Sequence, residues 1–331
     1  MTDATRATAP RSAPADDAPI RLGVSSCLLG ESVRYDGGHK RDRFLSDLLG
    51  EFVEWVPVCP EFESGLGIPR PAMRLIRADG EVRLREIQSG RDHTRRLAEF
   101  SRKRVRGLRS LDLCGYVLKK NSPSCGMERV KIYSPGGMPS TDGVGLYAKA
   151  LRKADPHLPV EEEGRLNDAR LRENFIERIF AYRRLKDLFR SSFSKRRVVE
   201  FHTAHKLQLM AHAPVIYRSL GRLVAELDRI PRVEFREQYA ADFMAALEKI
   251  ATPGRNANVL QHAAGHLKKR VEPASRQELA ELIHDYRRGL VPLVVPVMLL
   301  RHHARVHRVS YLERQTYLEP HPKELMLRNH V

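Results

Sequence analysis

In the first half of the chain, short apolar runs alternate with segments whose apolar residues recur at helical spacing. The apolar runs over residues 20–26, 54–58 and 111–118 are typical of strands. Helical spacing occupies residues 43–52 and 92–110 between them. Because strands that alternate with helices build parallel sheets, residues 20–160 are predicted to form an α/β domain with a parallel, doubly wound, Rossmann-like sheet.

The pattern changes after residue 155, where apolar positions keep helical spacing and no strand pattern follows. Residues 161–190 are predicted to form a helical connector that leads into an all-α domain over residues 191–331. The acidic triplet at residues 161–163 is expected to form a solvated turn or a helix start. In the all-α domain, the side chains expected in the core include Phe201, Tyr217 and Leu220.

Residues 1–19 are rich in Ala, Pro, Ser and Asp and contain no apolar segment, which is typical of a disordered tail and not of a secretory signal. We therefore expect a cytoplasmic protein. No apolar run approaches the roughly 20 residues that a membrane helix requires, so no membrane association is expected. The 42% apolar and 30% charged residues are those of a globular protein.

Positive charge changes this picture, because 58 lysines and arginines face 41 acidic residues and give a net charge of +17. Residues 191–331 alone contain 23 lysines and arginines against 14 acidic residues. Such a surface attracts polyanions and suits contacts to RNA phosphates, although it can also serve solubility alone. The candidate RNA-binding residues are His202, His205, Lys206, Lys268, Lys269, Arg270 and Arg301.

Three of the four cysteines, Cys27, Cys59 and Cys125, follow the three predicted strands. The carboxyl ends of parallel strands meet at one edge of a sheet, so these thiols are expected to converge. Soft thiolates suit an iron–sulfur cluster or zinc, and three ligands leave one metal position open for catalysis. Three unrelated buried thiols are an equally good interpretation. Cys114 lies inside an apolar run, which favours a buried strand residue over a fourth ligand.

Polar residues accompany the cysteines. Glu61 is placed for general acid or base catalysis, or it caps a helix or pairs with Arg70. Ser122 is suited to bind a substrate or to form an ordinary turn before proline. Arg34 and Asp36 either hold a phosphate or ribose or form a local ion pair. The candidate substrate-binding residues are Ser26, Arg34, Asp36, Arg70 and Lys120.

The segments VSSCLLGESVRYDGGHK, VPVCPEFESGLGIPRP and LKKNSPSCG resemble, in this order, the signatures of the TudS-type thiouracil desulfidases across about residues 20–160. The resemblance implies a 4Fe-4S cluster held by Cys27, Cys59 and Cys125, whose open iron takes the sulfur of a thiolated pyrimidine. It also implies catalytic roles for Glu61 and Ser122.

The segments PVEEEGRLND, FHTAHKLQLMAHAP and YRSLGRLVAE resemble the YbgA-type domain, across about residues 155–330. Two-domain proteins of this kind are linked to the removal of sulfur from 4-thiouridine in tRNA. The leading hypothesis is therefore a tRNA 4-thiouridine desulfidase with a 4Fe-4S cluster and tRNA as its partner. The alternatives are a desulfidase of free thiouracil or thiouridine monophosphate, and a non-catalytic iron–sulfur protein that binds nucleic acid.

Overall fold

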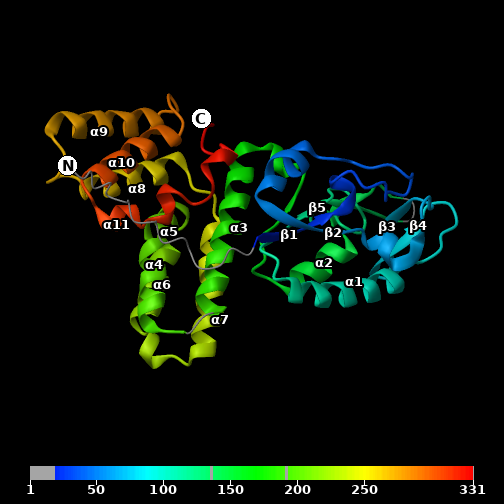
Figure 1. The fold of residues 1–331 in the computed structure, drawn as a ribbon. Coiled ribbons are helices and arrows are strands. Elements are labelled where there is room, and N and C mark those ends of the chain that lie inside the picture. The colour runs from blue at the N-terminus through cyan, green and yellow to red at the C-terminus, as the bar shows by residue number, and fades with distance from the viewer. Residues whose placement is uncertain (1–18, 135–136, 191–192, 331) are drawn as a thin grey trace, which may run out of the picture.

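The computed structural model describes residues 19–134, 137–190 and 193–330. Within these residues, an α/β part is followed by an all-helical part, and α3 (Ala169–Arg190) stands between the two (Figure 1). This arrangement confirms the predicted fold class. The predicted disordered tail, apart from Pro19, lies outside the described residues.

The first sheet has four parallel strands in the order β2-β1-β5-β8. The strands are β1 (Ile20–Ser25), β2 (Val53–Val58), β5 (Gly115–Leu118) and β8 (Val160–Glu162). Every residue of β5 is buried, as expected for a central strand with helices on both faces. The three predicted strands are present, and β8 extends the sheet into the segment predicted as a connector.

Helices cover both faces of this sheet. One face packs against α1 (Thr94–Leu108) and α2 (Leu146–Ala154), and the other packs against α3 (Figure 1). A Cβ atom at Gly115 would lie only 2.8 Å from Cγ1 of Ile179, so glycine allows α3 to approach β5 closely.

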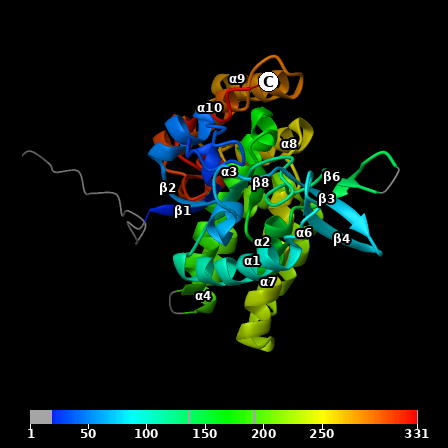
Figure 2. The ribbon, with the colours of Figure 1, turned by 90° about the vertical axis from the view of Figure 1, so that its right-hand side faces the viewer.

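A second four-stranded sheet, which the sequence analysis did not predict, has the order β4-β3-β6-β7. Its strands are β3 (Met73–Ala78), β4 (Glu81–Glu86), β6 (Val130–Tyr133) and β7 (Ser140–Gly143), and β3, β4 and β6 lie together in Figure 2. The helix predicted over residues 43–52 is also irregular. It consists of two short helical turns, η2 (Phe44–Leu48) and η3 (Leu49–Glu51).

The acidic triplet at residues 161–163 is buried, which contradicts the predicted solvated turn. Each carboxylate has a partner inside the protein. Glu161 pairs with Arg165 at 2.6 Å, and Glu163 accepts a hydrogen bond from the backbone N–H of Lys120 at 2.8 Å. Buried carboxylates are tolerated when they are paired in this way, and here they extend the edge of the first sheet.

The residues after α3 form helices. They are α4 (Lys195–Ala204), α5 (Lys206–His212), α6 (Pro214–Ala225), α7 (Arg232–Glu248), α8 (Pro253–Gly265), α9 (Pro273–Arg287), α10 (Val294–Val306) and α11 (Ser310–Glu313). Leu220 is buried as predicted, and Phe201 and Tyr217 pack against the same core. Across the described ranges, no helix is long and apolar enough to cross a membrane.

The two parts share a buried core along α3. Tyr182 and Leu185 of α3 belong to the same apolar cluster as Tyr116 of β5 and Phe243 of α7. The side-chain amide of Asn174 also donates a hydrogen bond to the carbonyl of Leu247 in α7, at 2.9 Å. The helical part is therefore packed directly against the α/β part.

Candidate functional site

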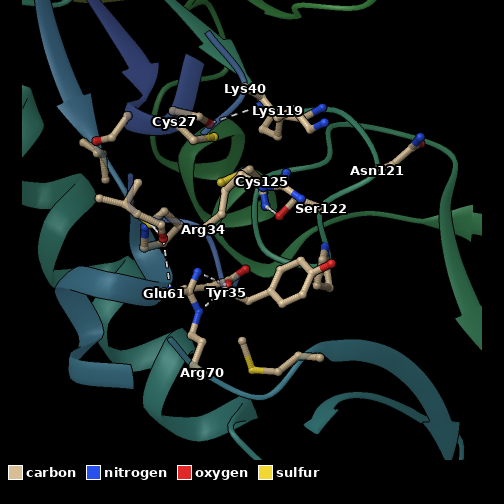
Figure 3. Close-up of a pocket in the computed structure, with 18 of the residues that line it drawn as sticks. Cys27, Arg34, Tyr35, Lys40, Glu61, Arg70, Lys119, Asn121, Ser122 and Cys125 are labelled. Carbon is tan, nitrogen blue, oxygen red and sulfur yellow. Dashed lines mark hydrogen bonds and ion pairs between the residues drawn. The ribbon is translucent and has the colours of Figure 1, made fainter. Parts of the chain in front are cut away.

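A cavity of about 430 Å³ lies at the carboxyl ends of β1, β2 and β5 (Figure 3). Cys27, Cys59 and Cys125 all line it, each on the loop after a different strand. In Figure 3 the sulfur atoms of Cys27 and Cys125 point toward the same space. All three cysteines are free thiols. The predicted convergence is confirmed, whereas the role of these thiols as ligands stays a prediction.

Hydrogen bonds from backbone N–H groups to side chains fix two of the cysteine loops. The N–H of Cys59 donates to Oε1 of Glu63 at 2.9 Å, and the N–H of Cys125 donates to Oγ of Ser122 at 3.0 Å. The loop after β5 also folds back on itself at Gly126, where a Cβ atom would lie 2.8 Å from the carbonyl oxygen of Ser122. Ser122 therefore shapes the turn that presents Cys125, and it lines the cavity as well.

The three thiols favour their neutral form when nothing is bound to them. Burial and the neighbouring Cys59 raise the pKa of Cys27 to about 11. Burial likewise raises the pKa of Cys59 and of Cys125. Lys119 and Arg34 act on Cys27 in the opposite direction. Thiolates at this site are therefore costly unless a bound cationic group neutralises them.

The donor set fits an iron–sulfur cluster, because three soft sulfur ligands border one cavity and each can hold a different iron atom. Among the described residues, no three His, Cys, Asp or Glu side chains lie together closely enough to hold a single metal ion.

Glu61 is the centre of a network that ties the three cysteine loops together. Nη2 and Nε of Arg70 donate to Oε2 of Glu61 at 2.6 and 2.9 Å, and Oγ of Ser124 donates to Oε1 at 2.8 Å. Nη1 of Arg70 also donates to the carbonyl of Val33 at 3.0 Å. The carboxylate therefore lines the cavity as expected and also forms the ion pair with Arg70 that the sequence analysis left open.

Four of the five predicted substrate-binding residues line the cavity, namely Ser26, Arg34, Arg70 and Lys120. Asp36 does not. Its Oδ1 accepts a hydrogen bond from the N–H of Gly38 at 3.1 Å and one from Nε of Arg34 at 3.4 Å. This exposed carboxylate stabilises the turn and orients Arg34, so the structure shows the local ion pair, while the substrate contact of Asp36 stays a prediction.

The sequence analysis missed several residues that line the cavity, among them Tyr35, Lys40 and Lys119. Tyr35 is 43% exposed, and the guanidinium of Arg34 lies 5.5 Å from the centre of its ring. Lys119 forms an ion pair with Glu163 beside the cavity. Lys119 directly follows the end of β5 and precedes Lys120, so its position near the cavity was predictable from the strand-end argument used for the cysteines. The positions of Tyr35 and Lys40 at the cavity depend on how the long loop between β1 and β2 folds.

Cys114 is separated from the other three cysteines by the length of β5, because it precedes the strand and Cys125 follows it. The side chain of Cys114 is fully buried, does not line the cavity and lies 3.8 Å from the carbonyl of Asp112. The predicted burial of Cys114 is confirmed.

The predicted RNA contact of His205 is wrong. This side chain is 2% exposed, and its ring packs against the rings of Phe201 and Phe243 at 4.0 and 5.3 Å between centres. Burial, assisted by the charge of Arg184, lowers the pKa of His205 to about 3. A buried, neutral imidazole has neither the exposure nor the charge that a phosphate contact requires.

The other predicted RNA-binding residues differ in exposure. His202 and Lys206 are half-buried, and burial lowers the pKa of His202 to about 4. Arg301 pairs with Glu319 at 2.6 Å. The exposed residues of this set are Lys268, Lys269 and Arg270. They lie between α8 and α9, and we call them the basic turn.

Sequence comparisons match both parts of the chain. Residues 22–163 match the 2-thiouracil desulfurase family, and residues 206–322 match a family described as protein of unknown function (DUF1722). The chain is 31% identical over 165 residues to the uncharacterized protein YbgA of Escherichia coli (strain K12), an alignment that covers 50% of this chain and 98% of YbgA.

The chain is also 33% identical over 150 residues to the uncharacterized protein YbbK of Bacillus subtilis (strain 168), covering 44% of this chain and 97% of YbbK. Among solved structures, it is similar to the [4Fe-4S]-dependent thiouracil desulfidase TudS, with 30% identity, a TM-score of 0.37, and coverage of 45% of this chain and 94% of that one. The chain therefore belongs to the 2-thiouracil desulfurase family through its α/β part and, through its helical part, is a DUF1722 protein homologous to YbgA.

Proposed function

We propose that this protein is an iron–sulfur-dependent desulfidase that converts 4-thiouridine in tRNA to uridine. The observation that carries the proposal is the single cavity bordered by three free thiols, the Glu61 carboxylate and several cations. Membership of the desulfurase family supports the reaction type. The reaction exchanges C=S for C=O, since water supplies the oxygen and the sulfur leaves as hydrogen sulfide, so no oxidant or reductant is consumed.

Cys27, Cys59 and Cys125 would hold a 4Fe-4S cluster. When bound, such a cluster supplies an iron without a protein thiolate, which is a Lewis acid for the substrate sulfur. The remaining tasks fall to side chains of this chain. A water molecule must lose its protons as it replaces the sulfur, and Glu61 is the carboxylate on the cavity wall that can accept one of them.

The cavity also offers groups that suit a nucleotide. The exposed ring of Tyr35 provides a face against which a pyrimidine can stack. Lys40 and Lys120 are exposed at the same cavity and can pair with a phosphate. These contacts suit free thiouridine monophosphate as well as a nucleotide within RNA, so free nucleotides remain the second candidate substrate.

The charge of the helical part favours RNA over the free nucleotide. A thiobase in folded tRNA is stacked, and exposing it costs on the order of a few kcal/mol. Contacts to the RNA backbone offset that cost, and the basic turn of Lys268, Lys269 and Arg270 presents three exposed cations for them. A free thiopyrimidine needs no such surface.

The test is desulfidation by the anaerobically reconstituted protein, followed by the loss of thiobase absorbance and the release of sulfide. We expect turnover of tRNA that contains 4-thiouridine. Replacing the three residues of the basic turn by alanine should weaken tRNA binding, reduce the slope of its salt dependence by up to about 3, and leave turnover of free 4-thiouridine unchanged. An intact cluster with no loss of thiobase from tRNA would refute the proposal.

Glu61→Gln gives a sharper test of the proton transfer. The amide keeps an acceptor for Ser124 but cannot take a proton, so we expect kcat to fall by about 10²–10⁴-fold while the iron content stays unchanged. Glu63→Gln is the matched control. Glu63 is close in sequence but does not line the cavity, and its amide replacement can still accept the N–H of Cys59, so kcat should change little. Equal rates in both variants would exclude Glu61 as the proton-transfer group.

A further inference from the structure

A second cavity, of about 230 Å³, lies in the helical part and shares no lining residue with the cavity of the cysteines. Its walls come from α3, from the first turn of α8, from the C-terminal end of α9 and from the segment that follows α9. This volume is below the range of a drug-sized ligand, which indicates a small molecule or a single group of a larger one.

Three arginines border this cavity without forming an ion pair among the described residues, although Arg170 lies near enough to Asp168 for its charge to help lower the pKa of that carboxyl. Arg170 lies in the first turn of α3, and Arg287 and Arg288 lie at the end of α9. All three are exposed, and within the described parts of the chain none of their guanidinium groups forms an ion pair or a hydrogen bond. Three unpaired guanidinium groups at one opening attract an anion, and their planar donors match the oxygens of a phosphate.

The acidic groups of the same cavity do not cancel this charge, because buried cations already pair with them. Glu177 bonds to His212 at 3.1 Å, and both Glu177 and Glu173 bond to Arg328, at 3.4 and 3.0 Å. Both ring nitrogens of His212 face oxygen acceptors, since Nδ1 lies 2.6 Å from the carbonyl of Lys249, so this imidazole is protonated.

Three helix ends lie at this cavity, because α3 and α8 begin there and α9 ends there, so the dipole of α9 opposes those of α3 and α8 and the helix ends do not cancel the charge of the arginines. The charge of the three arginines therefore remains.

The rest of the lining suits a ring. Ile250, Val291 and Leu293 supply apolar surface, and Asn174 and the hydroxyl of Tyr286 supply polar groups on the buried side. A ligand that places a phosphate among the arginines can therefore place a ring with hydrogen-bonding edges against the inner wall. A nucleotide combines both features, whereas inorganic phosphate would leave the apolar wall uncovered.

We propose that this cavity is a second binding site, which takes one nucleotide through its phosphate and its base. The nucleotide is either a free nucleoside monophosphate or a single residue of a bound RNA, since both present the same chemistry. The site lies outside the catalytic cavity, and the part of the proposal that concerns RNA rests on the proposed function.

The test is calorimetric titration of the full chain with uridine monophosphate, uridine and inorganic phosphate. We expect uridine monophosphate to bind more tightly than either fragment. Arg170→Ala, Arg287→Ala and Arg288→Ala should each weaken that binding by about tenfold or more, which is the loss of one charge-assisted hydrogen bond. The double variant Lys40→Ala/Lys120→Ala, which alters only the catalytic cavity, should leave it in place.

Because the three arginines are exposed, their variants should keep the unfolding temperature of the wild type, and this is measured alongside. If binding is lost in the lysine variant and kept in all three arginine variants, or if wild-type protein binds no nucleotide, the second site is excluded. Weaker tRNA binding by the arginine variants would assign the site to RNA, and unchanged tRNA binding would assign it to the free nucleotide. Turnover of free 4-thiouridine tests the proposed function separately.

Discussion

We expect Cys125→Ser to bind no stable iron–sulfur cluster and to desulfidate 4-thiouridine no faster than the reaction without protein. The serine hydroxyl is a poor ligand for iron at neutral pH, and the other two thiols cannot hold the cluster alone. Cys27→Ser and Cys59→Ser should behave alike, because all three side chains border the same cavity. Iron and sulfide analysis and the visible absorbance of the reconstituted protein measure the effect.

Cys114→Ser is the matched control. It makes the same chemical change at a buried cysteine that precedes β5, outside the cavity, and the new hydroxyl can donate to the nearby carbonyl of Asp112. Cluster content and turnover should stay at the wild-type level. If Cys114→Ser lost the cluster and Cys125→Ser kept it, the ligand assignment would be overturned.

The second large effect concerns the buried ion network between α3 and the helical part. Glu177 is 4% exposed and bonds to Gln208 at 2.9 Å, to His212 at 3.1 Å and to Arg328 at 3.4 Å. Glu177→Gln removes the negative charge and leaves the buried imidazole of His212 without an acidic partner, while Arg328 keeps only Glu173. We expect the free energy of unfolding to fall by about 3–5 kcal/mol, measured by urea denaturation at about pH 5.5.

Glu200→Gln is the control for this variant, because it removes a carboxylate of an exposed pair, with Arg196 on α4 at 2.8 Å. Exposed pairs of this kind contribute little to stability, because water and salt screen them. Equal destabilisation by both variants would show that the network does not hold the helical part together.

The network also has a defined pH range. Burial by itself would raise the pKa of Glu177. The charge of His212 and its hydrogen bond nevertheless hold that pKa below 4.5, the value for an unperturbed Glu. Burial by itself would lower the pKa of His212, but the charge and hydrogen bond of Glu177 raise that pKa above 6.5. The carboxylate contribution is therefore lost as the pH falls below about 4.5, and the imidazole contribution is lost as the pH rises through the folded pKa of His212. The destabilisation caused by Glu177→Gln should be largest between these limits.

The second sheet contains a hairpin that the sequence pattern was sufficient to predict, although the sequence analysis did not predict it. The segment MRLIRADGEVRLRE alternates apolar and polar residues on both sides of Asp79-Gly80, which is a hairpin signal, and β3 and β4 pair across that turn. The parallel pairing of β3 with β6 is different. It joins segments more than fifty residues apart, and no local pattern specifies such a partner.

The histidines of the helical part show the opposite case. His205 and His212 are polar residues within helical segments, and local spacing alone makes them as suitable for a surface as for the interior. Their burial depends on the rings of Phe201 and Phe243 for His205, and on Glu177 for His212. Phe201 lies only four residues before His205, whereas Phe243 and Glu177 come from the distant helices α7 and α3, so local spacing could not identify these two partners.

The sequence alone predicted that three cysteines follow strand ends at one edge of a parallel sheet, because strand ends and parallel topology follow from local pattern, and it left three unrelated buried thiols as an equal alternative. It also favoured a buried position for Cys114 over a fourth ligand. Only the tertiary structure decided that Glu61 is bound to Arg70 and Ser124, that Asp36 is not among the residues that line the cavity, and that three arginines without ion pairs among the described residues border a second one. Those facts depend on side chains that approach one another across long sequence separations, and the packing of the whole chain sets such distances.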